Sequence, residues 1–304
     1  MRLDPDRAGR DRQNLAGALR DLRRASGLSG DRLARRCGMS QSKISRIETG
    51  RLLPSVVDVE QMLTALGVDH ATRRELLTLA RVTNTEYHDI RASIRRGLHH
   101  RQKQLAALEA NTTQLRYFLP ALVTGLLQTP EYLSQALSSP INLAASADRS
   151  RSIAAKLDRQ SILYDHTKRF DFLLTENAVR WPLCAPDLMA EQLDHLVSIS
   201  QLPNVHIGIV PQGVHIPDGP MNSFVIYDTR LVTIELFTGQ LVLRDPKDID
   251  HYRALFDFFA SHALWSQDAR SLLKELAETF RDSKQFGHVH NPGVCPHHAH
   301  NVTV

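Results

Sequence analysis

The stretch LSGDRLARRCGMSQSKISRIETG, residues 28–50, decides the fold of the first part of the chain. Its apolar residues recur at helical spacing before Gly38 and resume after it: Leu33, Ala34, Cys37, Ile44 and Ile47. Glycine readily takes the positive φ that ends a helix, so Gly38 marks the turn between two short helices. Two such helices joined by a turn of a few residues predict a helix-turn-helix.

The second of these helices carries polar and basic side chains on its outward face: Gln41, Ser42, Lys43, Ser45 and Arg46. No acidic residue interrupts this face before Glu48. Side chains of this kind suit hydrogen bonding to base edges and phosphates in a DNA groove. The alternative is an ordinary pair of helices within a larger bundle, with a solvated outer face.

Residues 15–81 resemble the DNA-binding domain of the phage-repressor and Xre family, and residues 32–50 carry the resemblance most specifically. The resemblance implies that residues 40–49 are the recognition helix. It also implies that three of their side chains read bases: Gln41, Ser42 and Arg46. The full set of expected DNA contacts is Ser29, Ser40, Gln41, Ser42, Lys43, Ser45, Arg46 and Arg51.

Two further expectations come from the same resemblance. The family usually has glutamine at the position of Gly30, where it holds a phosphate, so Ser29 or Asp31 is expected to cap the first motif helix in this chain. The resemblance also places Arg23 beside Glu48, which would join the first helix of the domain to the end of the recognition helix.

Length and cysteine content limit the broad class of protein. A chain of 304 residues fits two domains. Three cysteines without CxxC spacing argue against a disulfide framework and for a reducing cytosol. The amino terminus lacks the apolar core of a signal peptide, and no apolar run approaches the ~20 residues that span a bilayer. We therefore expect a cytoplasmic chain that does not contact a membrane.

The net charge of +4 is distributed unevenly along the chain. Residues 1–110 contain 21 Lys and Arg against 13 Asp and Glu, a net charge of +8, whereas residues 111–304 contain 16 against 20, a net charge of −4. A basic surface supplies most non-specific affinity for DNA. Basic surfaces are also common on proteins that never contact DNA, so the charge supports the motif without replacing it.

The predicted fold class is mainly α, with a five-helix helix-turn-helix domain followed by an α+β domain. The expected divisions are a flexible arm (1–13), the DNA-binding domain (14–83), a basic helical connector (84–104), the α+β domain (105–284) and a disordered His-rich tail (285–304). The connector belongs to a long helical pattern that runs through residues 86–118.

The α+β prediction comes from runs rich in Val, Ile and Phe that follow several helical stretches: RFDFLL, VHIGIV, SFVIYDTRLVTIELF and QLVLRD. Asp228-Thr229-Arg230 looks like the connection of a hairpin between two of these strands. Two amphipathic helices, residues 249–264 and 267–282, complete the domain. We therefore expect a mainly antiparallel sheet packed against helices.

The segments RYFLP (116–120) and GLLQTPEY (125–132) resemble the opening of a domain that follows Xre-type motifs in actinobacterial regulators. The resemblance covers most of residues 105–283. It implies a regulator with an effector or partner domain whose biochemical function is not settled. Such regulators are often paired with a small acidic partner protein.

Glu176 and Glu235 each follow apolar strand residues and are the candidate ligand or partner contacts of this domain. They would bind a cationic group, or act as an acid and base pair, if both projected into one cavity. The alternative is that each caps a helix or pairs with an arginine such as Arg159 or Arg180. The sequence has no glycine-rich phosphate loop, GxSxG elbow or HExxH pair, so we expect neither an enzyme nor a cofactor.

The carboxyl-terminal tail is the one cluster of potential metal ligands: His288, His290, Cys295, His297, His298 and His300. Imidazole and thiolate suit zinc, copper or nickel. Because the regular spacings of a structural zinc site are missing, we expect no metal site in the cell.

The sequence thus predicts a transcriptional regulator that binds double-stranded DNA as a homodimer. Its second domain is expected to sense a small molecule or a partner protein. A rival hypothesis is an antitoxin-like or partner-binding module that binds DNA to autoregulate its operon. An enzyme with a DNA-binding anchor is a third possibility, disfavoured because no catalytic constellation is evident.

Overall fold

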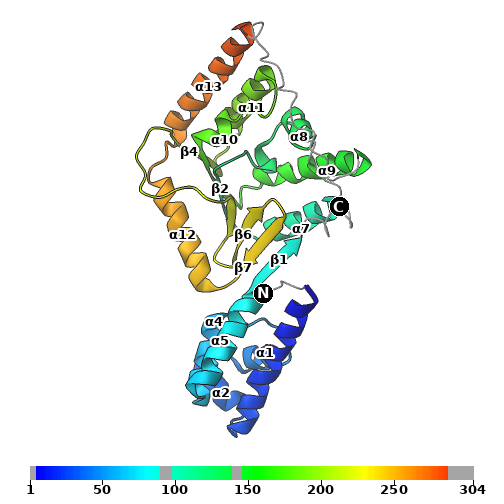
Figure 1. The fold of residues 1–304 in the computed structure, drawn as a ribbon, viewed down its shortest axis with the longest axis vertical. Coiled ribbons are helices and arrows are strands. Elements are labelled where there is room, and N and C mark those ends of the chain that lie inside the picture. Colours follow the sequence, from blue (N-terminus) through cyan, green and yellow to red (C-terminus); the bar gives the residue numbers. More distant parts are fainter. Residues whose placement is uncertain (1–4, 90–97, 139–145, 287–304) are drawn as a thin grey trace, which may run out of the picture.

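The computed structural model describes residues 5–89, 98–138 and 146–286 and divides them into a helical part and a sheet-containing part (Figure 1). The helical part comprises α1 (Pro5–Ala25), α2 (Gly30–Cys37), α3 (Gln41–Glu48), α4 (Val56–Leu66) and α5 (His70–Asn84). These helices enclose a core of their own, in which Leu19, Leu33 and Ile47 are fully buried. The helix-turn-helix is formed by α2 and α3.

Local capping fixes the ends of the motif helices. The hydroxyls of Ser29 and Ser40 cap the N-termini of α2 and α3, and Gly38 takes a φ of 64° at the end of α2. Ser55 and Asp58 form a reciprocal capping box at the start of α4. The sequence carries these signals within a few residues of each boundary, which explains why the helices lie where they were predicted.

The first helix is longer than expected. It begins at Pro5, whereas residues 1–13 were predicted to form a flexible arm, so that prediction is wrong for residues 5–13. Proline is well suited to the first helical position because its missing N–H would have no partner there. Residues 1–4 lie outside the described residues.

The second part contains a seven-stranded sheet, in the order β1-β7-β6-β5-β2-β3-β4 among the described residues. Its strands are β1 (Thr85–Asp89), β2 (Gln114–Leu119), β3 (Arg169–Thr175), β4 (Val205–Val210), β5 (Phe224–Tyr227), β6 (Leu231–Leu236) and β7 (Gly239–Leu243). Four neighbouring pairs are antiparallel, but β2, β3 and β4 run parallel to one another. The sheet is therefore mixed, and the predicted antiparallel arrangement describes only its β1-to-β2 side.

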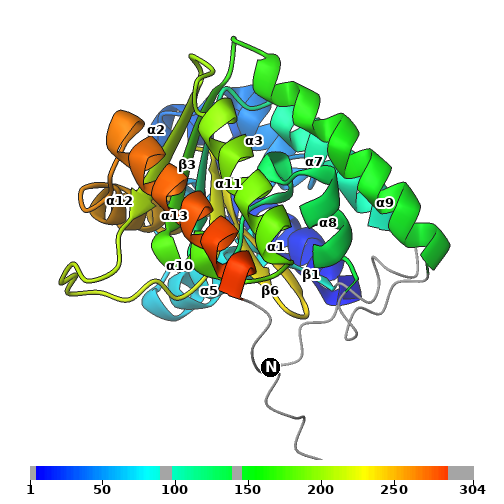
Figure 2. The same ribbon diagram turned by 90° about the horizontal axis from the view of Figure 1, so that it is seen from above.

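Helices cover both faces of this sheet (Figure 2). One face packs against α7 (Leu98–Ala110), η1 (Gly125–Leu127), η2 (Gln160–Tyr164), α10 (Glu176–Arg180), α11 (Pro186–Ile199) and α13 (Ser266–Phe286). Two further helices, α8 (Pro130–Ala136) and α9 (Ser146–Arg159), pack on these elements. The other face packs against α12 (Pro246–Ala260). Successive residues of a strand point to opposite faces, so Tyr117 stacks on Phe172 in the first core while Phe118 stacks on Phe259 in the second.

The predicted helical connector is a strand where it leaves the helical part. Residues 85–89 form β1, which pairs antiparallel with β7 at the edge of the sheet. The helical pattern expected for residues 86–118 is thus wrong at both ends, since residues 114–119 form β2, although α7 occupies residues 98–110. Pairing with β7 overrides the weak local preference of TEYHD. Residues 90–97 lie outside the described residues.

The His-rich tail, including His288, His290, Cys295, His297, His298 and His300, also lies outside the described residues. Among the helices of the described ranges, none is long and apolar enough to cross a membrane.

Candidate nucleic-acid interface

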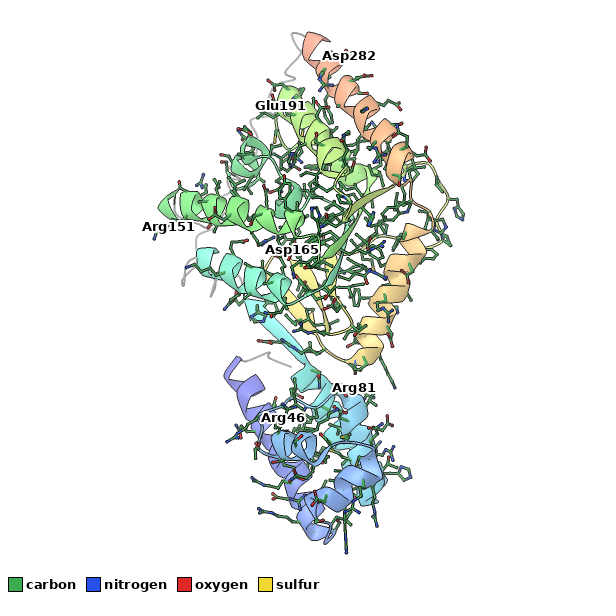
Figure 3. All side chains as sticks on the ribbon, turned by 180° about the vertical axis from the view of Figure 1, so that it is seen from behind. Arg46, Arg81, Arg151, Asp165, Glu191 and Asp282 are labelled. Carbon is green, nitrogen blue, oxygen red and sulfur yellow. The ribbon has the colours of Figure 1, made fainter. Side chains whose placement is uncertain are left out.

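The recognition helix α3 presents one buried and one exposed side. Ile44 and Ile47 are buried against the core of the helical part. The exposed side carries polar or basic side chains: Gln41, Ser42, Ser45 and Arg46. Figure 3 labels Arg46 among the side chains of this part of the molecule. Four of the predicted contacts therefore share one accessible helix surface.

Three of the predicted serines make local hydrogen bonds at the helix starts. The Ser29 Oγ accepts from the backbone N–H of Arg32 at 3.3 Å, so Ser29 is the cap that the glycine at position 30 requires. The Ser40 Oγ accepts from the backbone N–H of Lys43 at 3.2 Å and lies 3.1 Å from the Ser42 Oγ. These hydroxyls order the N-terminal ends of α2 and α3, whose positive dipole ends favour an anion such as a phosphate.

Lys43 is bound within the protein. Its Nζ lies 2.7 Å from the Asp58 Oδ1, and the other oxygen of Asp58 accepts from the Ser55 backbone N–H at 3.1 Å. The pair therefore joins α3 to the cap of α4. The Lys43 side chain remains 35% exposed, so its ammonium group keeps donors for the DNA contact that the sequence predicts while it pairs with Asp58.

Arg23 and Glu48 form the ion pair that the sequence analysis expected. The Arg23 Nε and Nη2 donate to the two Glu48 oxygens at 2.6 and 2.8 Å, and Nη1 donates to the Leu28 carbonyl at 3.0 Å. The two side chains are only 16% and 8% exposed. The hydrogen bonds that Arg23 donates to Glu48 raise the pKa of Arg23 above its ordinary value, against the opposing effect of burial. This bidentate pair fixes the C-terminal end of α3 relative to α1.

Because Gly30 has no side chain, the amide of Gln41 has open space beside it. A Cβ placed on Gly30 would have the Gln41 Nε2 as its nearest neighbour, at 3.8 Å. The Gln41 amide thus lies beside the first residue of α2. In the described residues no hydrogen bond holds this amide, which leaves it available to a base edge.

The structure adds two cations that the sequence analysis did not single out. Arg32 and Arg35 are exposed on α2, the helix that crosses the DNA backbone in motifs of this kind. Arg51, which was predicted, is exposed just after α3. No ion pair of these three arginines is present in the part of the chain that the structure describes. The basic run RLARRC was the available signal, because its arginines alternate with the buried residues of α2.

The structure does not bring Glu176 and Glu235 together. Glu176 follows β3 and Glu235 lies in β6, and the two intervening strands separate these strands by roughly 14 Å. Glu176 is buried, pairs with Arg180 and accepts from the Gln212 backbone N–H at 2.7 Å. Glu235 is exposed. The two carboxylates therefore do not project into one cavity, and Glu176 follows the alternative in which it pairs with an arginine.

Among the described residues of the second part, the most buried carboxylate is one that the sequence did not mark. Glu109 is 1% exposed, accepts from the Tyr117 hydroxyl at 3.0 Å and lies 3.2 Å from the Arg159 Nε. Burial raises the pKa of Glu109, although the charge of Arg159 opposes the effect. Since these partners come from α7, α9 and β2, the cluster joins two helices to the sheet.

Comparison with known proteins agrees with this division of the chain. A family model described as a helix-turn-helix domain matches residues 14–76, and one described as a domain of unknown function (DUF5753) matches residues 102–275. An uncharacterized HTH-type transcriptional regulator, y4dJ of Sinorhizobium fredii (strain NBRC 101917 / NGR234), is 40% identical over 57 residues. The match covers 19% of this chain and 70% of that protein.

Among solved structures, a phospholipase D family member, Nuc from Salmonella typhimurium, aligns with 55% of this chain and 90% of its own at 9% identity. Its TM-score of 0.31 is too low to carry an argument. The match to the domain of unknown function, by contrast, extends over more than half of the chain. The chain carries a helix-turn-helix domain and belongs to the family defined by that domain of unknown function (DUF5753).

Proposed function

We propose that this protein is a sequence-specific, DNA-binding transcriptional regulator of the Xre type that acts in the cytoplasm. The observation that supports the proposal best is the exposed side of α3, where the side chains of Gln41 and Arg46 have no hydrogen-bond or ion-pair partner among the described residues. The Arg23–Glu48 pair holds this helix in a fixed orientation. A preoriented helix with uncommitted polar side chains is what insertion into the major groove requires.

The side chains divide into two roles in this proposal. Arg46 donates two hydrogen bonds to a guanine, and Gln41 exchanges two with an adenine, since these pairings match the major-groove edges of those bases. Arg32, Arg35 and Arg51 contact phosphates, which position the domain without reading sequence. Ser45 lies on the same exposed side of α3 as Gln41 and Arg46.

We infer that two copies of the chain bind DNA together and that the second part controls them. One short recognition helix reads few base pairs, and dimers usually read two half-sites about 34 Å apart. The second part then senses a small molecule or a small acidic partner protein. The protein acts by binding and not by catalysis.

The test is selection of bound fragments from sheared genomic DNA, followed by titration of the selected sequence and its single-base variants at fixed salt. Arg46→Ala should cost about 1–3 kcal/mol on the selected site and lose discrimination at one base pair. The matched control is Arg74→Ala, which removes the same charge from an exposed position on α5.

Two results would count against the proposal. Failure to enrich any sequence would overturn specific DNA binding. An equal loss of affinity on every sequence would show that Arg46 contacts only phosphate.

A further inference from the structure

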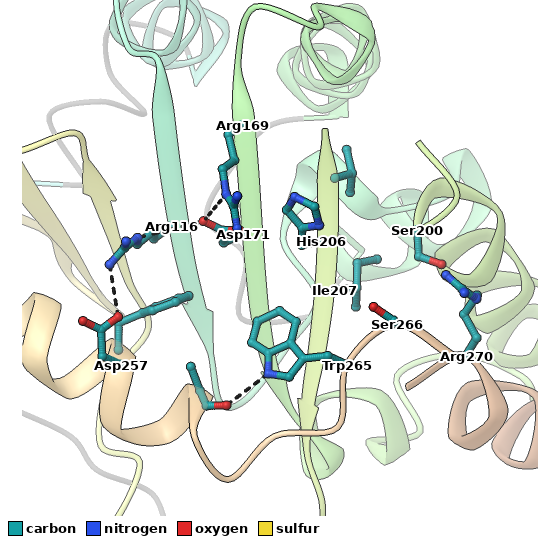
Figure 4. Close-up of a pocket in the computed structure, with 13 residues that line it drawn as sticks. Arg116, Arg169, Asp171, Ser200, His206, Ile207, Asp257, Trp265, Ser266 and Arg270 are labelled. Atoms are coloured by element: carbon teal, nitrogen blue, oxygen red, sulfur yellow. Dashed lines mark hydrogen bonds and ion pairs between the residues drawn. The ribbon is translucent and has the colours of Figure 1, made fainter. Parts of the chain in front are cut away.

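A cavity of about 350 Å³ opens on the face of the sheet that α12 covers only in part. It lies against the first residues of β2, β3 and β4 and is closed by α12 and the start of α13 (Figure 4). Its polar and aromatic lining includes Arg116, Arg169, Asp171, His206, Trp265 and Arg270. This volume falls within the ~300–1,000 Å³ of typical small-molecule sites.

One wall of the cavity is a rigidly held indole. A Cβ on Gly208 would lie 2.6 Å from the Trp265 ring, so the ring rests directly on the backbone of β4. Its Nε1 donates to the Ala260 carbonyl at 3.0 Å. The preceding residue, Leu264, exchanges two backbone hydrogen bonds with Ile209, at 2.8 and 2.9 Å. The chain thus presents a fixed flat aromatic surface to the cavity.

The backbone next to this indole is strained. Ser266 lines the cavity and has a φ of 51°, in the left-handed region that residues other than glycine seldom adopt. Such strain persists where the surrounding contacts impose it, and it concentrates at binding sites. The same turn starts α13, whose positive dipole end faces the cavity.

The charges of the lining leave one cation in excess. Arg169 pairs with Asp171 at 3.0 Å, and Arg116 pairs with Asp257 at 3.2 Å. Arg270 borders the same cavity, and its recorded partner in the described ranges is a neutral group, the Gln267 Oε1, at 3.2 and 3.4 Å. Because three arginines face two aspartates, the cavity favours an anion.

We propose that this cavity binds a small planar aromatic anion, a carboxylate or phosphate attached to an aromatic ring. The ring lies against Trp265, and the anionic group pairs with Arg270. A flat hydrophobic surface beside an uncompensated guanidinium matches both halves of such a molecule. The regulatory meaning of this site rests on the proposed function, because the anion would be the small molecule that the second part senses.

Helix α12 connects this cavity with the DNA-binding part. Its C-terminal half contributes Phe256 and Asp257 to the lining. The other end of α12, Pro246, lies about 15 Å along the helix from Phe256. Two residues before it, Arg244 donates its backbone N–H to the Asn84 carbonyl at 3.1 Å and pairs with Glu86 at 3.1 Å. A ligand that prefers one position of α12 therefore alters the junction and, through it, DNA affinity.

Intrinsic fluorescence gives a direct test. The chain has two tryptophans, so Trp181→Phe leaves Trp265 as the sole indole in the full-length protein. We expect benzoate or phenyl phosphate to change its emission saturably and benzamide, the neutral analogue, to bind at least about tenfold more weakly. Whether benzoate or phenyl phosphate binds more tightly identifies the preferred anionic group.

Arg270→Gln should weaken benzoate binding by about tenfold or more, whereas Lys274→Gln, an equal loss of charge on the exposed surface of α13, should not. Circular dichroism establishes that both variants are folded. Equal affinity for benzamide and benzoate, or equal effects of the two substitutions, would overturn the site.

Binding at Trp265 without any change in DNA affinity would overturn its effector role. Failure of DNA selection would instead contradict the proposed function and leave the anion titration interpretable.

Discussion

The ion pair between Arg23 and Glu48 fixes the orientation of α3 relative to α1. Glu48 is the last residue of α3, and its carboxylate lies almost entirely out of water. Removing it leaves the Arg23 guanidinium partly buried without an anion. Glu48→Ala should therefore lower the free energy of unfolding by about 3–5 kcal/mol.

A double-mutant cycle by urea unfolding, followed at 222 nm, measures this coupling. Arg23→Met combined with Glu48→Ala should recover part of the loss, since neither charge is then buried. Strictly additive losses would show that the two side chains do not stabilise each other.

Replacing the glycines at the two ends of α2 by alanine should change the stability of the protein in opposite directions. Gly30 is the first helical residue and has space for a Cβ, so Gly30→Ala should raise stability by up to about 1 kcal/mol. Gly38 has a positive φ, so Gly38→Ala should lower stability by about 1 kcal/mol or more. Melting temperatures of the two variants check this, and equal shifts would contradict the argument.

The ends of the two motif helices were predictable because their signals are local. Ser29, Gly38 and Ser40 mark helix ends within a few residues of the elements they bound. The pairing of Lys43 with Asp58 was not predictable in the same way. This ion pair joins two helices across a loop. The sequence does not show that Asp58 would pair with Lys43 as well as cap α4.

At the scale of elements, β1 shows what a local pattern cannot reveal. TEYHD has weak strand preference and follows a helix directly, yet it forms an edge strand because β7, some 150 residues later, supplies its partner. The parallel pairing of β2, β3 and β4 is equally hidden. Strand composition reports burial but not direction, so the run RFDFLL fits either kind of sheet.

The closeness of β1 to β7 predicts the effect of one substitution. A Cβ on Gly239 would lie 2.2 Å from the His88 carbonyl oxygen and 2.9 Å from the Tyr87 ring. Gly239→Ala should therefore loosen β1, and amide exchange of residues 85–89 should accelerate while β3 stays protected. Gly219→Ala, where no heavy atom lies within 4 Å of the added carbon, is the control. Unchanged amide exchange in residues 85–89 would mean that β1 accommodates the added methyl group without losing stability.

Glu86 of β1 should titrate far below an ordinary glutamate. The pKa of Glu86 is lowered from 4.5 to about 2, and the hydrogen bond with His88 is the largest cause. Burial opposes this shift, while the charges of His88 and Arg244 add to it. Because the native pKa lies below the unfolded one, the ionised carboxylate stabilises the fold above about pH 4.5, and this contribution disappears as pH falls towards 2. Partial exposure keeps the contribution small.

Carbon-13 NMR of the Glu86 carboxylate measures this titration. His88→Ala should raise its midpoint more than Arg244→Met, since the His88 hydrogen bond is the larger cause. The reverse order would assign the shift to Arg244.

At the scale of the whole molecule, the cavity beside Trp265 lay beyond sequence reasoning. Its walls come from β2, β3, β4, α12 and α13, and Arg116 lies some 150 residues from Arg270. No motif links such positions, whereas Glu176 and Glu235 attracted notice because each follows an apolar run. Proximity in this part depends on the strand order, which local composition does not determine.

Oligomeric state is also a property of the entire chain. The apolar residues of the helical part already fill its own core, so we expect dimer contacts in the second part. A fragment of residues 1–84 should be monomeric by light scattering and bind the selected DNA more weakly than the full chain. It retains the Asn84 side-chain bonds to the Pro54 and Ala80 carbonyls at 3.0 and 2.8 Å. A fragment that dimerised and bound equally well would contradict this prediction.

The direct step from α5 into β1 limits how such chains can be recombined. Asn84 ends the last helix of one part, and Thr85 begins the edge strand of the other. A hybrid protein joined after β1 would bring in the β1 strand of another protein. That strand would have to pack against Gly239, where there is no space for a further atom. In a hybrid joined between Asn84 and Thr85, the hydrogen bond from the Arg244 N–H to the carbonyl of residue 84 would connect the two proteins. Both groups belong to the backbone, so any residue except a proline at position 244 can make this bond. This peptide bond is therefore the preferred crossover point for exchanging DNA specificity between relatives.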